Sequence, residues 1–281
     1  MRLTFNHMIQ HRTDWKRKEM SSVTSTEAKL HVERTPRPGA PAILLLNALG
    51  VSLEMWDDQV QALAGHYDVI RFDARGHGKS TFGGRSEATI ELLASDVLAV
   101  MDACHIHRAH LCGLSLGGMV AMHIAARSPE RVLKAVMCNT TPHMPPRETW
   151  EARIQTALTQ GVEPLIEGTL GRWFTAEFCE AHPEKIAKIR SLLRQTSPAG
   201  YAACCAAIRD MDQREAIRGI TAETLVIAGA RDIGTTPAQA QLIASSIKKA
   251  KLVILDAAHL SNVECAEEFN ATLVRFLDGA L

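Results

Sequence analysis

Short apolar runs alternate with helical patterns along most of the chain. The runs occupy residues 42–46, 67–72, 108–112, 132–137, 224–228 and 252–255. They are too short for helices, and most are apolar throughout, which is typical of strands buried on both faces. Helical spacing follows them, for example at residues 90–101 and 116–127. This alternation predicts an α/β fold with a mostly parallel central sheet and helices on both of its faces.

One long segment breaks the alternation. Residues 140–219 carry helical patterns and no convincing strand, and they open with the linker residues Pro142, Pro145 and Pro146. Ligands of open α/β sheets bind beyond the carboxyl ends of the strands, so we expect this insertion to form a helical cap there, before the last two strands. The core then comprises residues 23–139 and 220–281. We expect residues 1–22 to be a disordered basic tail.

The composition limits the kinds of molecule that this chain is expected to bind. Lysine plus arginine and aspartate plus glutamate both number 31, so zero net charge gives no reason to expect nucleic acid or an anionic membrane. No apolar run approaches the ~20 residues of a spanning helix. The seven cysteines form no C-x-x-C pair and are interpreted as free thiols of a reducing compartment. We expect a cytoplasmic protein with a small-molecule substrate, and homo-oligomerisation stays open.

The segment Gly113-Leu114-Ser115-Leu116-Gly117 carries the strongest chemical signal. It follows a predicted strand and precedes a predicted helix, which is the context of a nucleophile elbow. Small residues at 113 and 117 let the backbone turn without a Cβ clash. The helix N-terminus behind the serine adds a partial positive charge. Ser115 is therefore the predicted nucleophile.

A serine hydroxyl needs a base, and the base needs an orienting acid. His259 is the only one of twelve histidines that lies beyond the run at 252–255. Asp232 follows the run at 224–228 and gives the chain order nucleophile, acid, histidine. Asp256 is a competing acid, but only three residues before His259 it would need a tight turn to reach the ring. We favour Asp232 and interpret Asp256 as a strand-end cap.

An oxyanion hole needs two amides directed at the developing negative charge. One predicted donor is the N–H of Leu116, the residue after the nucleophile. The second is expected in the loop after the run at 42–46, where Leu49 is favoured over Ala48.

Other chemistry-bearing residues have two interpretations. In the stretch 72–80, Asp73 and His77 are assigned to a structural turn with an Asp–Arg pair, because His77 would break the chain order. No metal site is predicted, since the three neighbouring histidines at 105, 107 and 110 lack a fourth ligand.

The cap residues Arg172 and Trp173 are candidates for substrate contact. The alternative, cap core plus surface charge, stays open. Weaker candidates of the same kind are Trp150, Arg147 and Arg153.

Six stretches together resemble the 3-oxoadipate enol-lactonases of aromatic catabolism. They are residues 47–50, 72–80, 112–120, 172–175, 198–212 and 256–264, and the similarity runs from Ile43 to Leu277. The first and third are common to many α/β hydrolases, whereas the stretch at 198–212 is specific. The resemblance implies hydrolysis of a five-membered enol-lactone bearing an acetate group, in the β-ketoadipate pathway, without a cofactor. Arg172 is then a candidate for the substrate carboxylate.

The same fold also serves other small esters, so a carboxylesterase or a perhydrolase is the alternative activity. A binding protein that merely shares the fold is disfavoured by the intact set of Ser115, Asp232 and His259.

Overall fold

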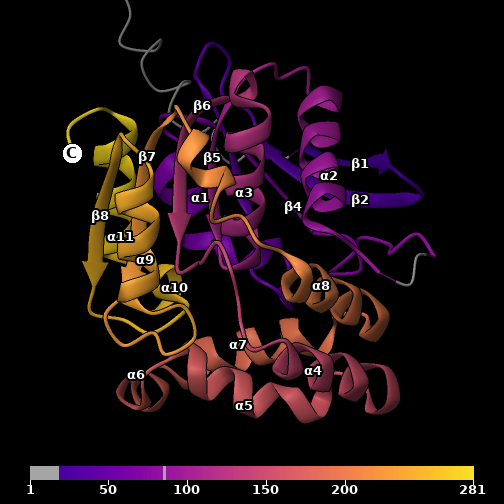
Figure 1. The fold of residues 1–281 in the computed structure, drawn as a ribbon. Coiled ribbons are helices and arrows are strands. Elements are labelled where there is room, and N and C mark those ends of the chain that lie inside the picture. Colours follow the sequence, from indigo (N-terminus) through magenta and orange to yellow (C-terminus); the bar gives the residue numbers. More distant parts are fainter. Residues whose placement is uncertain (1–18, 85–86) are drawn as a thin grey trace, which may run out of the picture.

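A central eight-stranded sheet organises the molecule (Figure 1). The structure is a computed structural model that describes residues 19–84 and 87–281. The strand order is β1-β2-β4-β3-β5-β6-β7-β8, antiparallel at β1–β2–β4 and parallel from β4 to β8. The strands are β1 (Glu19–Ser25), β2 (Ala28–Thr35), β3 (Ala42–Leu46), β4 (Asp68–Phe72), β5 (Ala109–Leu114), β6 (Val132–Cys138), β7 (Glu223–Gly229) and β8 (Ala250–Leu255). The predicted α/β fold is confirmed.

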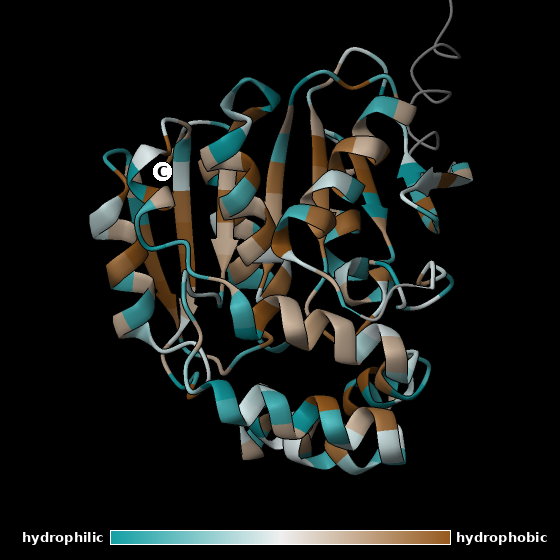
Figure 2. Cartoon of the chain, turned by 45° about the vertical axis from the view of Figure 1, so that its right-hand side comes forward, coloured by the Kyte–Doolittle hydropathy of each residue, from teal (hydrophilic) through white to brown (hydrophobic). Residues whose placement is uncertain are grey.

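The inner strands of the sheet are buried on both faces, and β3, β4 and β5 are buried along their whole length. Successive side chains of a strand point to opposite faces, so Leu44 and Leu46 of β3 join one apolar cluster while Ile43 and Leu45 join the other. Figure 2 shows brown strands between helices whose outer turns are teal. One face is covered by α2 (Ile90–Ala103), α3 (Leu116–Arg127) and α9 (Pro237–Ser246), and the other by α1 (Asp57–Leu63), α10 (Ser261–Glu264) and α11 (Ala266–Leu277).

A group of helices lies between β6 and β7 along the chain, as the predicted cap requires. They are α4 (Arg147–Gln160), α5 (Glu163–Trp173), α6 (Ala176–Ala181), α7 (Pro183–Arg194) and α8 (Pro198–Asp210). In Figure 1 they lie below the sheet, at the end toward which the arrows of β6 and β8 point. We call these helices and their connections the cap. It covers the carboxyl ends of the parallel strands.

The hairpin of β1 and β2 was not predicted. In β2 the buried residues Ala28, Leu30 and Val32 alternate with exposed or half-buried polar ones. A charged, half-exposed strand of this kind lacks the apolar run that indicates the inner strands. Because β1 begins at Glu19, residues 19–22 of the expected tail belong to a strand. Residues 1–18 of that tail lie outside the described residues.

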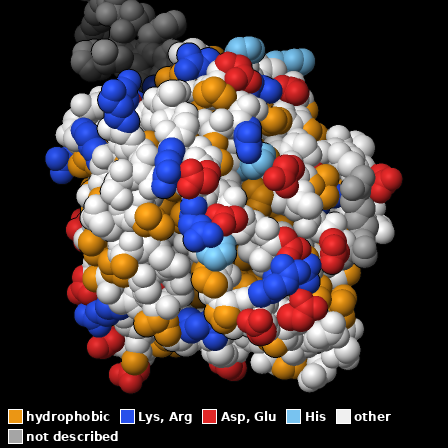
Figure 3. All heavy atoms as spheres, viewed as in Figure 1, with side chains coloured by type: hydrophobic (Ala, Val, Ile, Leu, Met, Phe, Trp, Pro, Cys, Tyr) orange, Lys and Arg blue, Asp and Glu red, His pale blue; other side chains and the backbone are white. Residues whose placement is uncertain are grey.

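The surface carries both charges. On the face seen in Figure 3, acidic and basic side chains are interspersed. In the part of the chain that the structure describes, no helix is both long and apolar enough to cross a membrane. All seven cysteines are free.

Candidate active site

Ser115 lies on a strained turn between β5 and α3. Its backbone has φ 57° and ψ −115°, in the left-handed half of conformational space. Such a conformation costs a non-glycine residue about 1–3 kcal/mol and persists only where its surroundings impose it. The Ser115 N–H donates to the Cys138 carbonyl at 2.9 Å, and the Ser115 carbonyl accepts from Thr140 Oγ1 at 2.7 Å. The end of β6 therefore holds the turn in place.

Two glycines allow the close packing around this turn. A Cβ on Gly113 would lie 2.1 Å from the Gly117 carbonyl oxygen, and a Cβ on Gly117 would lie 2.1 Å from that of Leu46. Neither glycine has a positive φ. Close approach of backbone, rather than backbone conformation, requires glycine at these positions.

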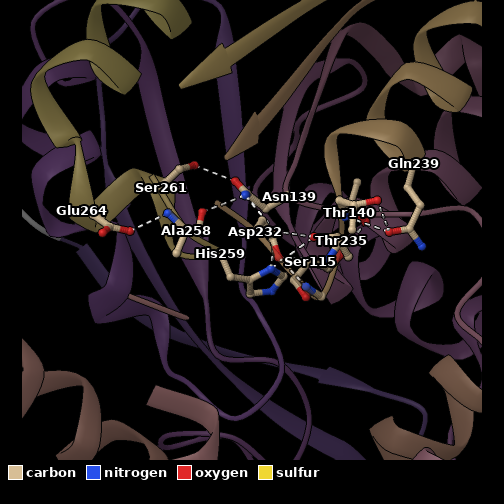
Figure 4. Close-up of polar contacts among 12 residues, drawn as sticks. Ser115, Asn139, Thr140, Asp232, Thr235, Gln239, Ala258, His259, Ser261 and Glu264 are labelled. Atoms are coloured by element: carbon tan, nitrogen blue, oxygen red, sulfur yellow. Dashed lines mark hydrogen bonds and ion pairs between the residues drawn. The ribbon is translucent and has the colours of Figure 1, made fainter. Parts of the chain in front are cut away.

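His259 and Asp232 form a buried pair beside the serine (Figure 4). His259 Nδ1 lies 2.7 Å from Asp232 Oδ2, and both residues are buried. A carboxylate can only accept, so the ring proton is on Nδ1 and the neutral ring presents a bare Nε2. This is the tautomer that a general base for Ser115 needs.

Asp232 accepts five hydrogen bonds. Oδ2 accepts from His259, Asn139 Nδ2 and Thr235 Oγ1, and Oδ1 accepts from the N–H groups of Gly234 and Thr235. Burial alone would raise the pKa of Asp232, but the electrostatic interaction with His259 and these hydrogen bonds outweigh it and hold the pKa well below its ordinary value. Asp232 is therefore a carboxylate at neutral pH.

Ser115 and His259 line the same pocket, and Figure 4 draws their side chains next to each other. No hydrogen bond joins Ser115 Oγ to the ring within residues 19–84 and 87–281. Catalytic hydrogen bonds are often long in ligand-free enzymes and tighten with substrate. The expected competitor Asp256 is 73% exposed and pairs with Arg231 at 2.8 Å. It therefore makes a surface ion pair rather than a strand-end cap.

The loop after β3 contains three consecutive N–H groups, those of residues 48–50, and two of them donate hydrogen bonds within the protein. The Ala48 N–H donates to Met55 Sδ at 3.4 Å, and the Gly50 N–H donates to His77 Nε2 at 2.9 Å. For the Leu49 N–H, as for the Leu116 N–H at the start of α3, no acceptor is present in the described chain. Leu49 also lines the pocket with Ser115. The structure thus favours Leu49 over Ala48 as the available amide.

The pocket of about 240 Å³ lies between the cap and the ends of the strands, and it is lined by four of the five cap residues singled out from the sequence, Trp150, Arg153, Arg172 and Trp173. The fifth, Arg147, lies outside the pocket in an exposed ion pair with Asp210. The Trp173 ring stacks on that of His259 with centroids 6.1 Å apart. The Trp150 indole N–H donates to the Met144 carbonyl at 3.1 Å, so only its ring remains for other contacts. The Trp173 ring therefore packs against His259 and also lines the pocket.

Two arginines bring positive charge into this pocket. Arg153 lies over the Trp150 ring, 4.9 Å from its centroid, and Arg172 Nη2 donates to Thr169 Oγ1 at 3.3 Å. Burial lowers the pKa of Arg172, and the charge of Arg153 lowers it further. Neither guanidinium meets a carboxylate among the residues that the structure describes. Two neighbouring cations without anions suit an anionic ligand. The sequence alone makes Arg153 a weaker candidate than Arg172, because its position in the pocket follows only from the fold of the cap.

The stretch 72–80 is structural, but its predicted Asp–Arg pair is wrong. Asp73 accepts from the N–H groups of Leu53 and Lys79, at 2.8 and 2.9 Å. The turn wraps around this carboxylate so closely that a Cβ on Gly78 would lie 2.4 Å from it. Arg75 instead forms a buried ion pair with Asp96 at 2.6 Å.

Among the described residues, no group of three or more histidines, cysteines and acids is placed to hold a metal ion. Of the three neighbouring histidines, His110 is buried and meets the Tyr67 ring edge-on, with centroids 5.8 Å apart. It serves the core.

A parallel sheet under a helical cap, with a serine on a strand-to-helix turn beside an Asp–His pair, defines an α/β hydrolase. A family model of the alpha/beta hydrolase fold matches residues 41–265, and the chain belongs to that family. It is similar to 3-oxoadipate enol-lactonase 2 of Acinetobacter baylyi, with 36% identity over 249 residues, covering 89% of this chain and 93% of that protein. These similarities make it a carboxylic ester hydrolase.

Two further comparisons involve relatives whose names give different substrates. The crystal structure of the enol-lactonase from Burkholderia xenovorans LB400 has a TM-score of 0.90 and 40% identity, and the match covers 92% of this chain and 100% of that one. A protein of Agrobacterium fabrum that bears the name carbamate hydrolase RutD is 27% identical over 243 residues, 85% of this chain and 93% of that protein. Hydrolysis is common to these relatives, whereas their named substrates differ.

Proposed function

We propose that this enzyme hydrolyses 3-oxoadipate enol-lactone to 3-oxoadipate, a step of aromatic degradation by the β-ketoadipate pathway. One observation carries the proposal: Ser115, His259 and Asp232 share a pocket with two arginines that meet no carboxylate among the described residues. The proposed substrate has both features that such a pocket suits, a strained ester carbonyl and a separate carboxylate. The named activities of the enol-lactonase relatives support the same choice.

The first half-reaction forms an acyl-enzyme. His259 Nε2 takes the proton of Ser115 Oγ as the oxygen attacks the lactone carbonyl. The negative charge of the tetrahedral intermediate is stabilised by the N–H groups of Leu116 and Leu49. Asp232 stabilises the imidazolium and keeps the ring oriented. Collapse of the intermediate breaks the ring C–O bond, and the imidazolium of His259 gives its proton to the leaving enolate oxygen, which leaves His259 neutral again. The enol formed in this way then tautomerises to the ketone.

The second half-reaction regenerates the enzyme. His259 Nε2 takes a proton from water, and the hydroxide formed attacks the acyl carbonyl. The same two amides stabilise the second oxyanion, and Ser115 leaves with a proton from His259. The products are 3-oxoadipate and free enzyme, so the balance needs only water.

The acetate carboxylate of the substrate is assigned to the arginine pair. Arg172, with Trp173 and Trp150 as walls, was singled out from the sequence, and Arg153 joins it in the pocket. The carboxylate is bound equally in the ground and transition states, so removing an arginine should mainly raise KM. We expect Arg153→Met and Arg172→Met each to raise KM for the lactone about tenfold or more, the cost of a charged hydrogen bond.

Loss of lactone absorbance on adding purified enzyme tests the proposal, with Ser115→Ala as the inactive reference. A neutral methyl ester of the acetate group and p-nitrophenyl acetate are matched substrates that lack the carboxylate. The arginine variants should hydrolyse these two as the wild type does. Arg190→Met is the control variant, because Arg190 pairs with Glu167 outside the pocket.

The competing activities give a different pattern. A general carboxylesterase would cleave p-nitrophenyl acetate efficiently and leave the lactone intact. A carbamate hydrolase would act on a simple carbamate with higher kcat/KM than on the lactone. Either result would replace the proposed substrate while leaving the serine hydrolase chemistry in place.

A further inference from the structure

Gly50, next to the proposed oxyanion donor Leu49, is held on both sides by side chains from distant segments. Its N–H donates to His77 Nε2 at 2.9 Å, and its carbonyl accepts from Thr196 Oγ1 at 2.7 Å. Gly50 has φ +87°, and a Cβ there would lie 2.9 Å from Leu193 of the cap. Its backbone groups are therefore fixed by one residue of the core and one of the cap.

His77 is bound in a single tautomer. Its ring is fully buried, and Nδ1 lies 3.0 Å from the Arg75 carbonyl oxygen. That oxygen can only accept, so Nδ1 carries the proton and Nε2 is left as an acceptor for the Gly50 N–H. A protonated ring would oppose the Gly50 N–H with a second donor. The stretch 72–80 thus contains a fixed acceptor aimed at the loop after β3.

Thr196 connects the same loop to the cap. It precedes α8, whose first turn docks on the turn containing His77: the Ser197 N–H donates to the Gly76 carbonyl at 3.1 Å. The backbones meet so closely that a Cβ on Gly76 would lie 2.4 Å from the Gly200 Cα. The position of the cap and the conformation of Gly50 are therefore set together.

We propose that His77 and Thr196 are positioning residues of the reaction, which hold Gly50 so that the preceding Leu49 N–H stays directed at the oxyanion. The peptide that carries this N–H lies between two peptides whose own N–H groups are bound, by Met55 and His77. If Gly50 lost its acceptor, the peptide that joins it to Leu49 would be free to rotate. The proposal rests on the proposed role of Leu49 in hydrolysis, whatever the ester.

A matched pair of variants isolates the His77 contact. In His77→Gln the side-chain amide reaches the place of Nε2 and offers an oxygen to Gly50, whereas in His77→Asn it reaches only the place of Nδ1. We expect His77→Asn to lower kcat for p-nitrophenyl acetate about ten- to a hundredfold, with KM changed less than about threefold. His77→Gln should retain most of kcat. Rates are expressed per active site, counted from the initial burst of p-nitrophenolate.

This normalisation separates positioning from folding. A purely structural role would lower the thermal midpoint and the number of active sites, yet leave the rate per site unchanged. A second readout is inhibition by phenylboronic acid, whose tetrahedral adduct with a serine mimics the oxyanion. Its affinity should fall in His77→Asn together with kcat, and recover in His77→Gln.

The Thr196 side of Gly50 provides an independent pair. Thr196→Ser keeps the hydroxyl, and Thr196→Val keeps the shape without it. We expect a several-fold loss of kcat per site in the valine variant only. Unchanged kcat per site in both His77→Asn and Thr196→Val would overturn the proposal. Because the assay uses p-nitrophenyl acetate, failure of the enzyme on the lactone would count against the proposed substrate and not against these positioning residues.

Discussion

Asn139 Nδ2 lies 3.0 Å from Asp232 Oδ2, the same carboxylate oxygen that His259 Nδ1 contacts at 2.7 Å. Asn139 stands at the end of β6, and its Nδ2 also donates to the Ala258 carbonyl at 3.1 Å. The Ser261 hydroxyl donates to Asn139 Oδ1 at 2.6 Å and so fixes which way the amide faces. One amide therefore joins β6, the Asp232 loop and the His259 loop (Figure 4).

Removing this amide should impair turnover without abolishing it. In Asn139→Ala, Asp232 keeps the hydrogen bonds from Thr235 and Gly234, so we expect kcat to fall about tenfold, the cost of one charged hydrogen bond. Asn139→Asp should be worse, because a second carboxylate faces the first. Steady-state kinetics on p-nitrophenyl acetate measure both. Asn270→Ala, an amide on α11 that contacts Gln59, is the control. Equal activity of all three variants would contradict the role of Asn139.

The two aspartates near the end of the chain should respond in opposite ways. Asp232→Asn leaves the His259 ring facing an amide and favours the wrong tautomer, so kcat should fall about 10⁴-fold. Asp256→Asn removes only an exposed ion pair with Arg231, which is worth little. Its kcat should match that of the wild type. Steady-state assays under one buffer condition compare them, and the reverse ranking would transfer the role of the acid to Asp256.

Chain order and strand ends were enough to predict the residues that meet in the pocket. Ser115 and Asp232 follow the buried strands β5 and β7, His259 follows the half-exposed edge strand β8, and parallel strands end at one edge of the sheet. The inner strands were predictable because both of their faces are buried and their sequences are apolar. The hairpin β1–β2 was missed because its outer side chains are polar.

The supporting contacts were beyond prediction because they join segments far apart in the chain. Asn139 and Asp232 are 93 residues apart, and Gly50 and Thr196 are 146 apart. Nothing local distinguishes Asn139 from a turn residue. The Asp–Arg pair expected in the stretch 72–80 failed for a similar reason, since the true partner of Arg75 is Asp96 on a different element.

Two substitutions of Ser115 should separate activity from stability. Both Ser115→Ala and Ser115→Gly remove the nucleophile, so kcat should fall by orders of magnitude, and retention of more than about a tenth would exclude the serine. Only glycine relieves the positive φ of 57°. We expect Ser115→Gly to be about 1 kcal/mol more stable than Ser115→Ala. Urea unfolding of the two proteins gives the difference, and a less stable glycine variant would argue against strain at the turn.

Burial of His110 should make the fold sensitive to mild acid. Desolvation, aided by the charge of Lys134, lowers the pKa of His110 from 6.5 to about 4. Between these two values the unfolded chain binds a proton that the native ring does not, so stability is present above pH 6.5 and is lost as pH falls below it. We expect the free energy of unfolding to drop by about 1–2 kcal/mol between pH 7 and pH 5 from this residue.

The His110→Phe variant tests that origin, because phenylalanine fits an aromatic contact with Tyr67 and cannot titrate. Its absolute stability depends on how the core repacks, so the informative quantity is the slope of the unfolding free energy against pH. That slope should be smaller than in the wild type by up to the contribution of one bound proton. Part of the slope should remain in the variant, because burial also lowers the pKa of His77. Urea titrations at pH 5, 6 and 7 give the slopes. Identical slopes in the two proteins would mean that His110 has the same pKa in the native and the unfolded state, and would contradict the prediction.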